Sequence, residues 1–259
     1  MNLHEKAEAA QTAARKAGAM LRAHGALKVS RKSANDFVTE MDTASEKLIR
    51  GELLSRFPED GFFGEEFGGS EATDGRWIVD PIDGTASFMR GHHGYCISIA
   101  YQYKGALVLG CVYAPDTDEM FLGIRGEGAW LNGAPIHVSE VSDISSSFAH
   151  FGYCHRHPAE REYMLRILPD ICRSISDLRR YGSAAYALCC VACGRSDAFF
   201  ELKLNIYDVA AGIVIAEEAG GKTSGWLPGE DAALSGNILC TNGILHEEYL
   251  TLLNREPHP

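Results

Sequence analysis

The chain has 259 residues, 46% of them hydrophobic, which is enough to bury a sizeable core in one or two domains. This composition excludes a disordered, a collagen-like and a disulfide-stapled protein. The formal net charge is −11, from 24 basic and 35 acidic residues, and such a surface disfavours nucleic acid and anionic lipid as main partners.

The first half of the chain begins with two predicted helices. Apolar residues recur at helical spacing over 3–25, which predicts an amphipathic helix. The segment 35–42 predicts a short strand or turn. Thr43 and Glu46 then have the spacing of a capping box, so we expect a second helix from here to the Phe57–Pro58 pair.

Strand patterns follow these helices. A compact apolar run at 77–79 ends in an aspartate, and Lys104–Gly105 predicts a tight hairpin between two apolar segments. Asn132–Gly133 is a second strong turn signal. Together these patterns predict an antiparallel sheet with further strands at 95–103, 106–114, 120–124 and 130–131.

After about residue 145, strand and helix patterns alternate. This alternation indicates helices packed on a mixed or parallel sheet. We therefore predict two closely packed subdomains, 1–145 and 146–259. The predicted strands are 148–153, 175–180, 198–202 and 238–241, and the predicted helices are 158–169, 183–193, 208–219 and 244–253.

The cysteines and the first residues of the chain predict the cellular compartment. The eight cysteines lie among apolar or small residues without a regular framework, which is typical of reduced, buried thiols in a cytosolic protein. No basic segment followed by an apolar run opens the chain, and no apolar stretch approaches the ~18 residues that span a bilayer. We expect a cytoplasmic protein without a membrane partner.

Three acidic groups have settings that suggest chemistry. Glu65 and Glu66 follow a glycine after a short apolar segment, and Asp208 precedes an apolar helix pattern. The segment DPIDGT at 80–85 directly follows the apolar run 77–79. Two aspartates three positions apart at a strand end can point into one crevice, and Gly84 permits a turn that exposes backbone N–H groups to an anion.

Carboxylates beside an anion site require a cation between them. Oxygen ligands favour a hard cation such as Mg²⁺, which bridges carboxylates to phosphate oxygens. A solvated loop would explain Glu65 and Glu66 by themselves, and a helix N-cap would explain Asp208 by itself. Neither reading explains DPIDGT after a buried strand, so the three groups together predict a metal–phosphate site.

These segments resemble the signature motifs of the inositol monophosphatase family. The resemblance rests on GEE at 64–66, WIVDPIDGT at 77–85, YDVAAG at 207–212, Gly220–Gly221 and DFVTEMD at 36–42. It covers nearly the whole chain in the right order. It implies an α/β fold, an αβαβα layered sandwich, and a homodimer with an active site between the subdomains.

The resemblance also implies roles for individual residues. It implies two or three Mg²⁺ ions, one on Glu65, Asp80 and the Ile82 carbonyl, one on Asp80, Asp83 and Asp208, and a weaker third touching Glu65. Gly84 and Thr85 would present backbone N–H groups to the phosphate, and Thr85, Glu65 and Asp42 would position and deprotonate the attacking water. The alcohol side of the substrate would contact Asp83, Ala184, Glu201, Asn205 and Asp208.

The chain departs from the family pattern near this site. Ala86–Ser87 stands where Thr-Asn is usual, Asn205 where animal inositol enzymes carry histidine, and Tyr207 where tryptophan is common. Lys203 replaces a usual glycine. It could meet a second anionic group of the substrate, but a solvent-facing lysine on an exposed turn is the preferred interpretation.

The function that follows is Mg²⁺-dependent hydrolysis of a small phosphorylated alcohol. Inositol monophosphate is the first candidate substrate. Histidinol phosphate, a nucleoside bisphosphate and fructose bisphosphate are alternative substrates, because family members with these activities share the metal motifs. A regulatory interaction protein is the alternative from another functional class.

Overall fold

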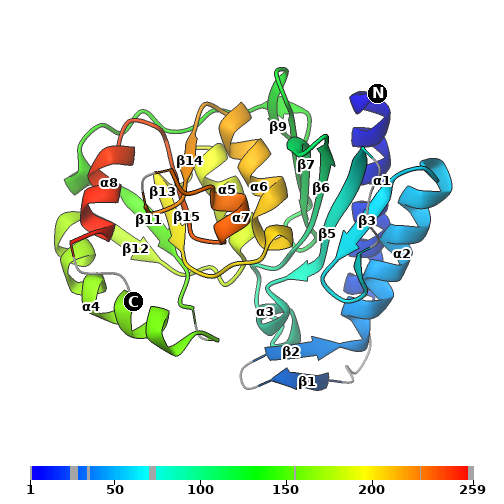
Figure 1. Cartoon of the computed structure of the whole chain (residues 1–259), viewed down its shortest axis with the longest axis horizontal. Helices are drawn as coiled ribbons and strands as arrows, with labels where there is room; N and C mark the ends of the chain where they lie inside the picture. The colour runs from blue at the N-terminus through cyan, green and yellow to red at the C-terminus, as the bar shows by residue number, and fades with distance from the viewer. Residues whose placement is uncertain are drawn as a thin grey trace.

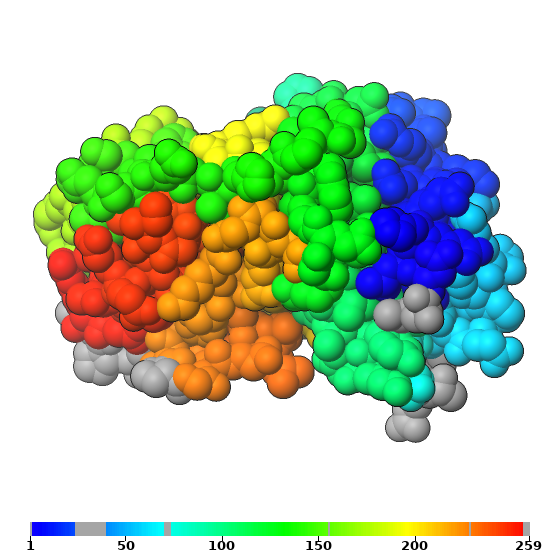
Figure 2. Space-filling view, turned by 90° about the horizontal axis from the view of Figure 1, so that it is seen from above, coloured from blue at the N-terminus to red at the C-terminus, as the bar shows by residue number. Residues whose placement is uncertain are grey.

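The computed structural model describes residues 2–23, 29–33, 36–69, 74–154, 156–227 and 229–255. Their elements form five layers, in the order helix, sheet, helix, sheet, helix (Figure 1). The predicted αβαβα sandwich is therefore confirmed. The space-filling view shows one continuous body with the first helix at one end and the last helix at the other (Figure 2). None of the described helices is long and apolar enough to cross a membrane.

The outer layer of the first half consists of helices α1 (Leu3–Arg22) and α2 (Glu40–Arg56), which contact each other and the first sheet. The buried face of α1 is a row of alanines, so the helix lies close to the sheet. At Gly18 the ring of Tyr113 lies 2.6 Å from where a Cβ would be, which leaves no room for a side chain. The helix ends at Arg22, three residues before the predicted end.

The first sheet has eight strands and is mixed. β5 (Gly75–Asp83) pairs in parallel with β3 (Gly61–Gly64) and antiparallel with β6 (Cys96–Tyr103), and the other pairings are antiparallel, as predicted for the hairpins. A separate hairpin of β1 (Val29–Ser33) and β2 (Asp36–Thr39) precedes α2. In spatial order the sheet is β10 (Ala134–Pro135), β9 (Gly128–Leu131), β8 (Glu119–Ile124), β7 (Ala106–Ala114), β6 (Cys96–Tyr103), β5 (Gly75–Asp83), β3 (Gly61–Gly64) and β4 (Gly68–Gly69).

The middle layer consists of α5 (Ala184–Ala192) and α6 (Ile206–Glu218), which lie between the two sheets (Figure 1). Helix α6 rests on a pair of facing glycines, Gly110 of β7 and Gly123 of β8. A Cβ at Gly110 would lie 2.2 Å from the carbonyl oxygen of Ala211, and one at Gly123 would lie 2.8 Å from the Cα of Ile215. These glycines allow the close contact that sets the position of α6.

The second sheet has five strands and is also mixed. Its two faces are apolar, because Phe199 packs toward the middle helices while Phe200 packs toward the outer helices. The outer layer contains α4 (Pro158–Ser174) and α8 (His246–Leu253). In spatial order the strands are β12 (Asp177–Arg179), β11 (Phe148–Phe151), β13 (Ala198–Glu201), β15 (Ile238–Thr241) and β14 (Lys222–Ser224), and the short helices elsewhere are α3 (Thr85–Met89), η1 (Ile144–Ser146) and α7 (Ala232–Ser235).

Two sequence-based expectations about helices are wrong in detail. Helix α2 begins at Glu40, so Thr43 and Glu46 lie inside the helix and do not form its capping box. Helix α4 continues to Ser174 although Pro169 removes one backbone donor, because Ile167 and Ile171 on either side of the proline are both buried in the core.

The predicted free cysteines are present, but they are not uniformly buried. Six of the eight thiols are buried, Cys193 is half-buried and Cys172 on α4 is exposed. The predicted boundary near residue 145 falls between the strands of the first sheet and those of the second.

Candidate functional site

Three aspartates meet where β5 ends and α6 begins. Asp80 and Asp83 are the last aspartates of β5, and Asp208 occupies the third position of α6. Each offers a carboxylate oxygen that lies within 4.8 Å of the others, and the three residues are 2%, 7% and 7% exposed. Strand β5 of the first sheet and helix α6 thus bring together acidic groups that are 125 residues apart in sequence, Asp83 and Asp208.

Hydrogen bonds hold each carboxylate in place. The backbone N–H of Ile82 donates to Asp80 Oδ1 at 3.0 Å. The hydroxyl of Ser183 and the backbone N–H of Ala185 both donate to Asp83 Oδ2 at 2.7 Å. The same carboxylate therefore connects the end of β5 to the start of α5.

Burial and mutual repulsion make this cluster unfavourable without a cation. Burial first, and then the negative charge of Glu65, raises the pKa of Asp80 well above its ordinary value. Burial and the charge of Asp208 act in the same direction on the pKa of Asp83. A divalent cation would reverse this effect by favouring the ionised carboxylates.

The turn after β5 presents a hydroxyl next to this cluster. Gly84 has a φ of 92°, a conformation that glycine adopts without steric cost, and Thr85 begins α3. The hydroxyl of Thr85 lies 3.0 Å from Asp42 Oδ1 and 3.0 Å from the carbonyl oxygen of Ile82, and its single proton can go to either. Asp42 is 1% exposed and lies behind Thr85, on α2.

Glu65 lines the cleft because a buried residue of α2 holds its loop. The carboxylate of Glu46 accepts hydrogen bonds from the backbone N–H groups of Glu66, at 2.7 Å, and Phe67, at 3.0 Å. Residue 64 must be a glycine here, because a Cβ would lie 2.1 Å from Glu46 Oε1. Glu46 is thus a positioning residue, although its spacing from Thr43 predicted a helix cap.

The opposite wall of the cleft contains Ala184, at the start of α5, and Glu201, at the end of β13. The Glu201 carboxylate occupies the space above Gly152, where a Cβ would lie 1.7 Å from it. Burial, followed by repulsion from Asp208, raises the pKa of Glu201 to about 7. This group therefore titrates near neutral pH and can both accept and donate a hydrogen bond.

Comparison with known proteins decides the family. The model of the inositol monophosphatase family matches residues 2–258. The chain belongs to the inositol monophosphatase family. Among curated relatives, Nus factor SuhB of Vibrio cholerae is 37% identical over 246 residues, which cover 93% of this chain and 92% of the relative.

Solved structures of this family have the same fold. The extragenic suppressor protein suhB from Bartonella henselae superposes with a TM-score of 0.92 at 35% identity, covering 96% of this chain and 98% of that one. An inositol monophosphatase from Anabaena superposes with a TM-score of 0.88 at 31% identity, covering 100% and 98%.

The cleft gathers nine of the eleven residues singled out from the sequence. The lining residues among them are Glu65, Asp80, Ile82, Asp83, Gly84, Thr85, Ala184, Glu201 and Asp208. Asp42 contacts the cleft through Thr85. Asn205 is exposed, and its backbone N–H donates to Asp208 Oδ2 at 2.6 Å. Through this bond Asn205 helps to orient Asp208.

The departures from the family pattern lie mainly around the cleft. Lys203 is exposed, has a φ of 59° and lies 3.7 Å from Glu160, so it faces solvent and does not line the cleft. Its positive φ explains why glycine is usual at this position. Tyr207 packs on Phe63, with ring centroids 6.3 Å apart, and Ala86 lines the cleft.

The cleft also contains two arginines and a serine for which the sequence predicted no role in this site. Arg156 and Arg180 line the cleft on the side of Glu201, and Arg180 counteracts the rise in the pKa of Glu201. Ser183 is a hydrogen-bond donor to Asp83, not a nucleophile. Arg180 and Ser183 lie beside and within the YGSA turn at 181–184, which is the only local signal for them, and the sequence around Arg156 offers none.

Proposed function

We propose that this member of the inositol monophosphatase family is a magnesium-dependent phosphatase that hydrolyses a small phosphate monoester. Inositol monophosphate is the first candidate substrate. The observation that carries the proposal is the buried triad of Asp80, Asp83 and Asp208, with carboxylate oxygens within 4.8 Å of one another. A buried cluster of like charges is costly to keep without a counter-ion.

The donor set fits magnesium. All the candidate ligands are oxygen atoms, from Glu65, Asp80, Asp83, Asp208 and the Ile82 carbonyl, which is the set that a hard divalent cation prefers. Bound magnesium, two or three ions per site, would supply Lewis-acid stabilisation of the ester oxygens and a lowered pKa for water.

The residues of the chain have separate tasks in this proposal. The backbone N–H groups of Gly84 and Thr85 orient the phosphate at the start of α3. The Thr85 hydroxyl positions the attacking water, together with Glu65, which also lines the cleft. As the hydroxyl takes up the proton of the water, it passes its own proton to the Asp42 carboxylate behind it. Fixed donors of this kind stabilise developing charge without reorganisation.

The alcohol part of the substrate would occupy the wall opposite this turn. Ala184 and Glu201 line that wall, and Asp83 and Asp208 line the cleft beside the turn. All four would contact the alcohol, and Asn205 supports Asp208 through its hydrogen bond. A carboxylate pair such as Glu201 and Asp208 can accept hydrogen bonds from the hydroxyl groups of a polyol. This chemistry favours a hydroxyl-rich alcohol such as inositol.

An assay of the purified chain with myo-inositol 1-phosphate tests the proposal. We expect phosphate release with Mg²⁺, none with EDTA, and less when Li⁺ is added. Absence of phosphate release under all conditions would refute it. A panel with histidinol phosphate, a nucleoside bisphosphate and fructose bisphosphate then ranks the alternative substrates.

The names of the curated relatives favour a second candidate function. SuhB of Vibrio cholerae is named a Nus factor, and it aligns over most of this chain. We propose that such a regulatory role would use the fold without the metal cluster. If both the wild-type chain and the Asp83→Asn variant replace SuhB in a Vibrio cholerae strain that lacks it, the regulatory function is independent of catalysis.

The oligomeric state and the partners belong to the same proposal. We propose a cytoplasmic homodimer whose partner is a small phosphorylated alcohol and neither nucleic acid nor a membrane. Light scattering coupled to gel filtration would give twice the 28.2 kDa mass of the chain for a dimer.

A further inference from the structure

Ser98 joins the two segments that carry the acidic cluster. It lies on β6 directly opposite Asp80 of β5, and partner residues on antiparallel strands share one face of a sheet. Its hydroxyl donates to the backbone carbonyl oxygen of Tyr207 at 3.2 Å. Tyr207 belongs to the first turn of α6 and directly precedes Asp208. One side chain of β6 thus connects the surroundings of Asp80 to those of Asp208.

This connection is buried and does not depend on which side chain occupies position 207. Ser98 is 1% exposed, so bulk water does not compete for its hydroxyl. The acceptor is a backbone carbonyl, whose two lone pairs can serve the helix and the hydroxyl together. Breaking the bond would leave a polar group without this partner in the interior.

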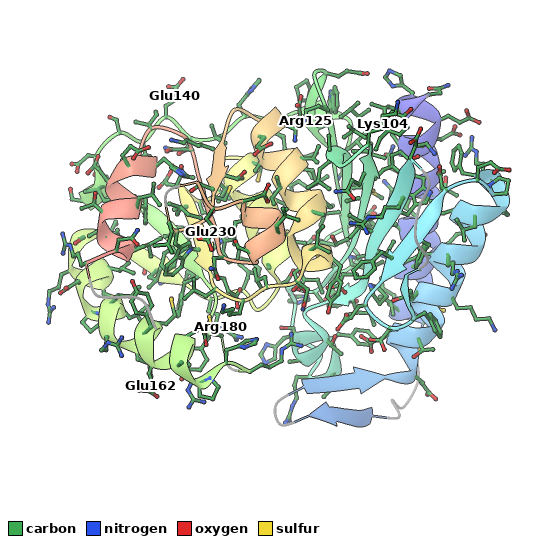
Figure 3. All side chains as sticks on the ribbon, in the orientation of Figure 1. Lys104, Arg125, Glu140, Glu162, Arg180 and Glu230 are labelled. Carbon is green, nitrogen blue, oxygen red and sulfur yellow. The ribbon has the colours of Figure 1, made fainter. Side chains whose placement is uncertain are left out.

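Helix α6 has a second attachment to the first sheet at its other end. Arg125, in the turn between β8 and β9, lies 2.8 Å from Glu217 and 3.4 Å from Glu218. The backbone N–H of Gly128 also donates to Glu218, at 3.0 Å. Figure 3 shows Arg125 at the end of the first sheet away from α3. Polar contacts with the first sheet therefore hold both ends of α6, and the bond from Ser98 lies beside the acidic cluster.

Directional bonds are needed here because close packing by itself does not fix the helix along the sheet. Gly110 and Gly123 let α6 approach the sheet closely, but a surface of glycines does not stop the helix from sliding. The aspartates cannot set their own spacing, since the negative charges of Asp80 and Asp208 repel each other. An uncharged donor such as the Ser98 hydroxyl holds the helix without adding to that repulsion.

The other hydrogen bonds of the cluster have a different task. The backbone N–H of Ile82 orients Asp80, and the hydroxyl of Ser183 orients Asp83. Each of these bonds fixes the direction of one carboxylate. The bond from Ser98 instead fixes how far the first turn of α6 lies from β5, which matters for a cation that both segments bind.

The spacing of oxygen ligands decides which divalent cation fits. Mg²⁺ requires oxygens at about 2.0–2.1 Å in a nearly ideal octahedron, and Ca²⁺ takes them at about 2.3–2.6 Å in a more flexible arrangement. The carboxylate oxygens of Asp80, Asp83 and Asp208 lie within 4.8 Å of one another. A shift of a few tenths of an ångström between β5 and α6 is therefore enough to change the preferred cation.

We propose that Ser98 is a positioning residue that fixes the spacing of Asp80 and Asp208 and so makes the site select Mg²⁺ over the larger Ca²⁺. This inference rests on the metal site of the proposed function and adds what sets its cation preference. Without the hydroxyl the first turn of α6 can move away from β5, which penalises Mg²⁺ more than Ca²⁺.

Calorimetric titrations of the full chain with Mg²⁺ and with Ca²⁺, in the absence of substrate, test this role. Ser98→Ala removes the hydroxyl and changes the volume of the side chain little. We expect its affinity for Mg²⁺ to fall about fivefold, the scale of one hydrogen bond, while its affinity for Ca²⁺ changes much less. The ratio of the two dissociation constants separates this effect from a general loss of stability.

Ser147→Ala is the matched control. Ser147 is also buried, its hydroxyl bonds to that of Tyr249 at 2.7 Å, and neither residue lines the cleft. This variant should lower the melting temperature without changing the ratio of the two dissociation constants. Ser98→Thr keeps a hydroxyl on β6 and should keep the wild-type ratio.

Equal ratios for the wild type and Ser98→Ala, or an equal change of the ratio in Ser147→Ala, would overturn the proposal. A wild-type chain that binds neither cation would overturn it as well. The expected ratios without phosphate release from any ester would support the role of Ser98 and contradict the phosphatase activity, so the two failures are distinguishable.

Discussion

Asp83 illustrates how much one carboxylate can do at the residue scale. Its Oδ2 atom accepts hydrogen bonds from Ser183 and Ala185, which leaves Oδ1 for a ligand. The geometry of the residue is therefore set from the far side of the cleft, before any metal binds. The negative charge of its carboxylate would attract a metal cation.

We expect Asp83→Asn to keep the fold and lose about 100-fold or more of the activity, the scale of removing one preorganised electrostatic group. The amide oxygen can still accept from Ser183 and Ala185, but the charge is gone. Initial rates with inositol 1-phosphate and thermal unfolding measure the two effects. Asp170→Asn, an exposed change of the same type on α4, is the control, and unchanged turnover of Asp83→Asn would show that the metal assignment is wrong.

At the element scale, helices position the acidic loops. Glu46 extends from α2 to two backbone N–H groups of the loop that carries Glu65. Glu46 is fully buried, so its removal leaves those two donors unpaired.

We expect Glu46→Ala to reduce the free energy of unfolding by about 1–3 kcal/mol, the cost of unsatisfied buried donors. It should also raise the magnesium concentration needed for half-maximal activity, because Glu65 loses its support. Denaturant unfolding and a magnesium titration of the rate measure these effects. Glu52→Ala on the same helix removes only a half-exposed ion pair with Lys16, and equal effects of both variants would contradict the positioning role.

The close packing of α6 on the first sheet gives a second prediction at this scale. Gly123→Ala places a Cβ 2.8 Å from the Cα of Ile215, so either the helix moves or the strand bends. We expect a loss of about 1–3 kcal/mol in the free energy of unfolding, as for overpacking of a core. A shift of α6 also moves Asp208, so activity should fall as well.

Gly51→Ala is the matched control for this substitution. Gly51 lies within α2 with no atom within 4 Å of its Cβ position, and alanine favours a helix interior by about 1 kcal/mol over glycine. This variant should be slightly more stable than the wild type. Thermal unfolding of both variants tests the contrast, and a Gly123→Ala protein as stable as the wild type would show that the contact is not tight.

At the scale of the whole molecule, the acidic cluster links stability to pH. In the metal-free protein the pKa values of Asp80 and Asp83 are raised, and that of Glu201 rises from 4.5 to about 7. Between the ordinary and the raised pKa the folded state holds more protons than the unfolded chain. The free energy of unfolding therefore decreases as pH rises through this interval.

We expect magnesium to raise the melting temperature more at about pH 8 than at about pH 5. At the higher pH the carboxylates are ionised and repel each other unless a cation is bound. Thermal unfolding in EDTA and in magnesium at both pH values measures the difference, with sodium chloride of equal ionic strength as the control. An equal gain at both pH values would contradict the linkage.

The ligands of the candidate metal site could be predicted from local sequence. Asp80, Asp83 and Thr85 lie on one strand–turn–helix segment, whose proline and glycine define the backbone path over a few residues. Asp208 could be predicted only in combination with these residues and the family resemblance, because a helix N-cap would explain it by itself. Helix ends were less predictable, since α2 begins before its apparent cap and α4 continues through Pro169.

The amino-acid sequence by itself determined which oxygen atoms are available and which short segments turn toward one another. Only the tertiary structure decided that Glu46 supports Glu65, that Ser183 orients Asp83, and that Arg180 lines the cleft. Local backbone preference acts over a few residues, whereas these contacts join residues far apart in sequence. They depend on how helices pack on sheets, and on the glycines that allow a close approach.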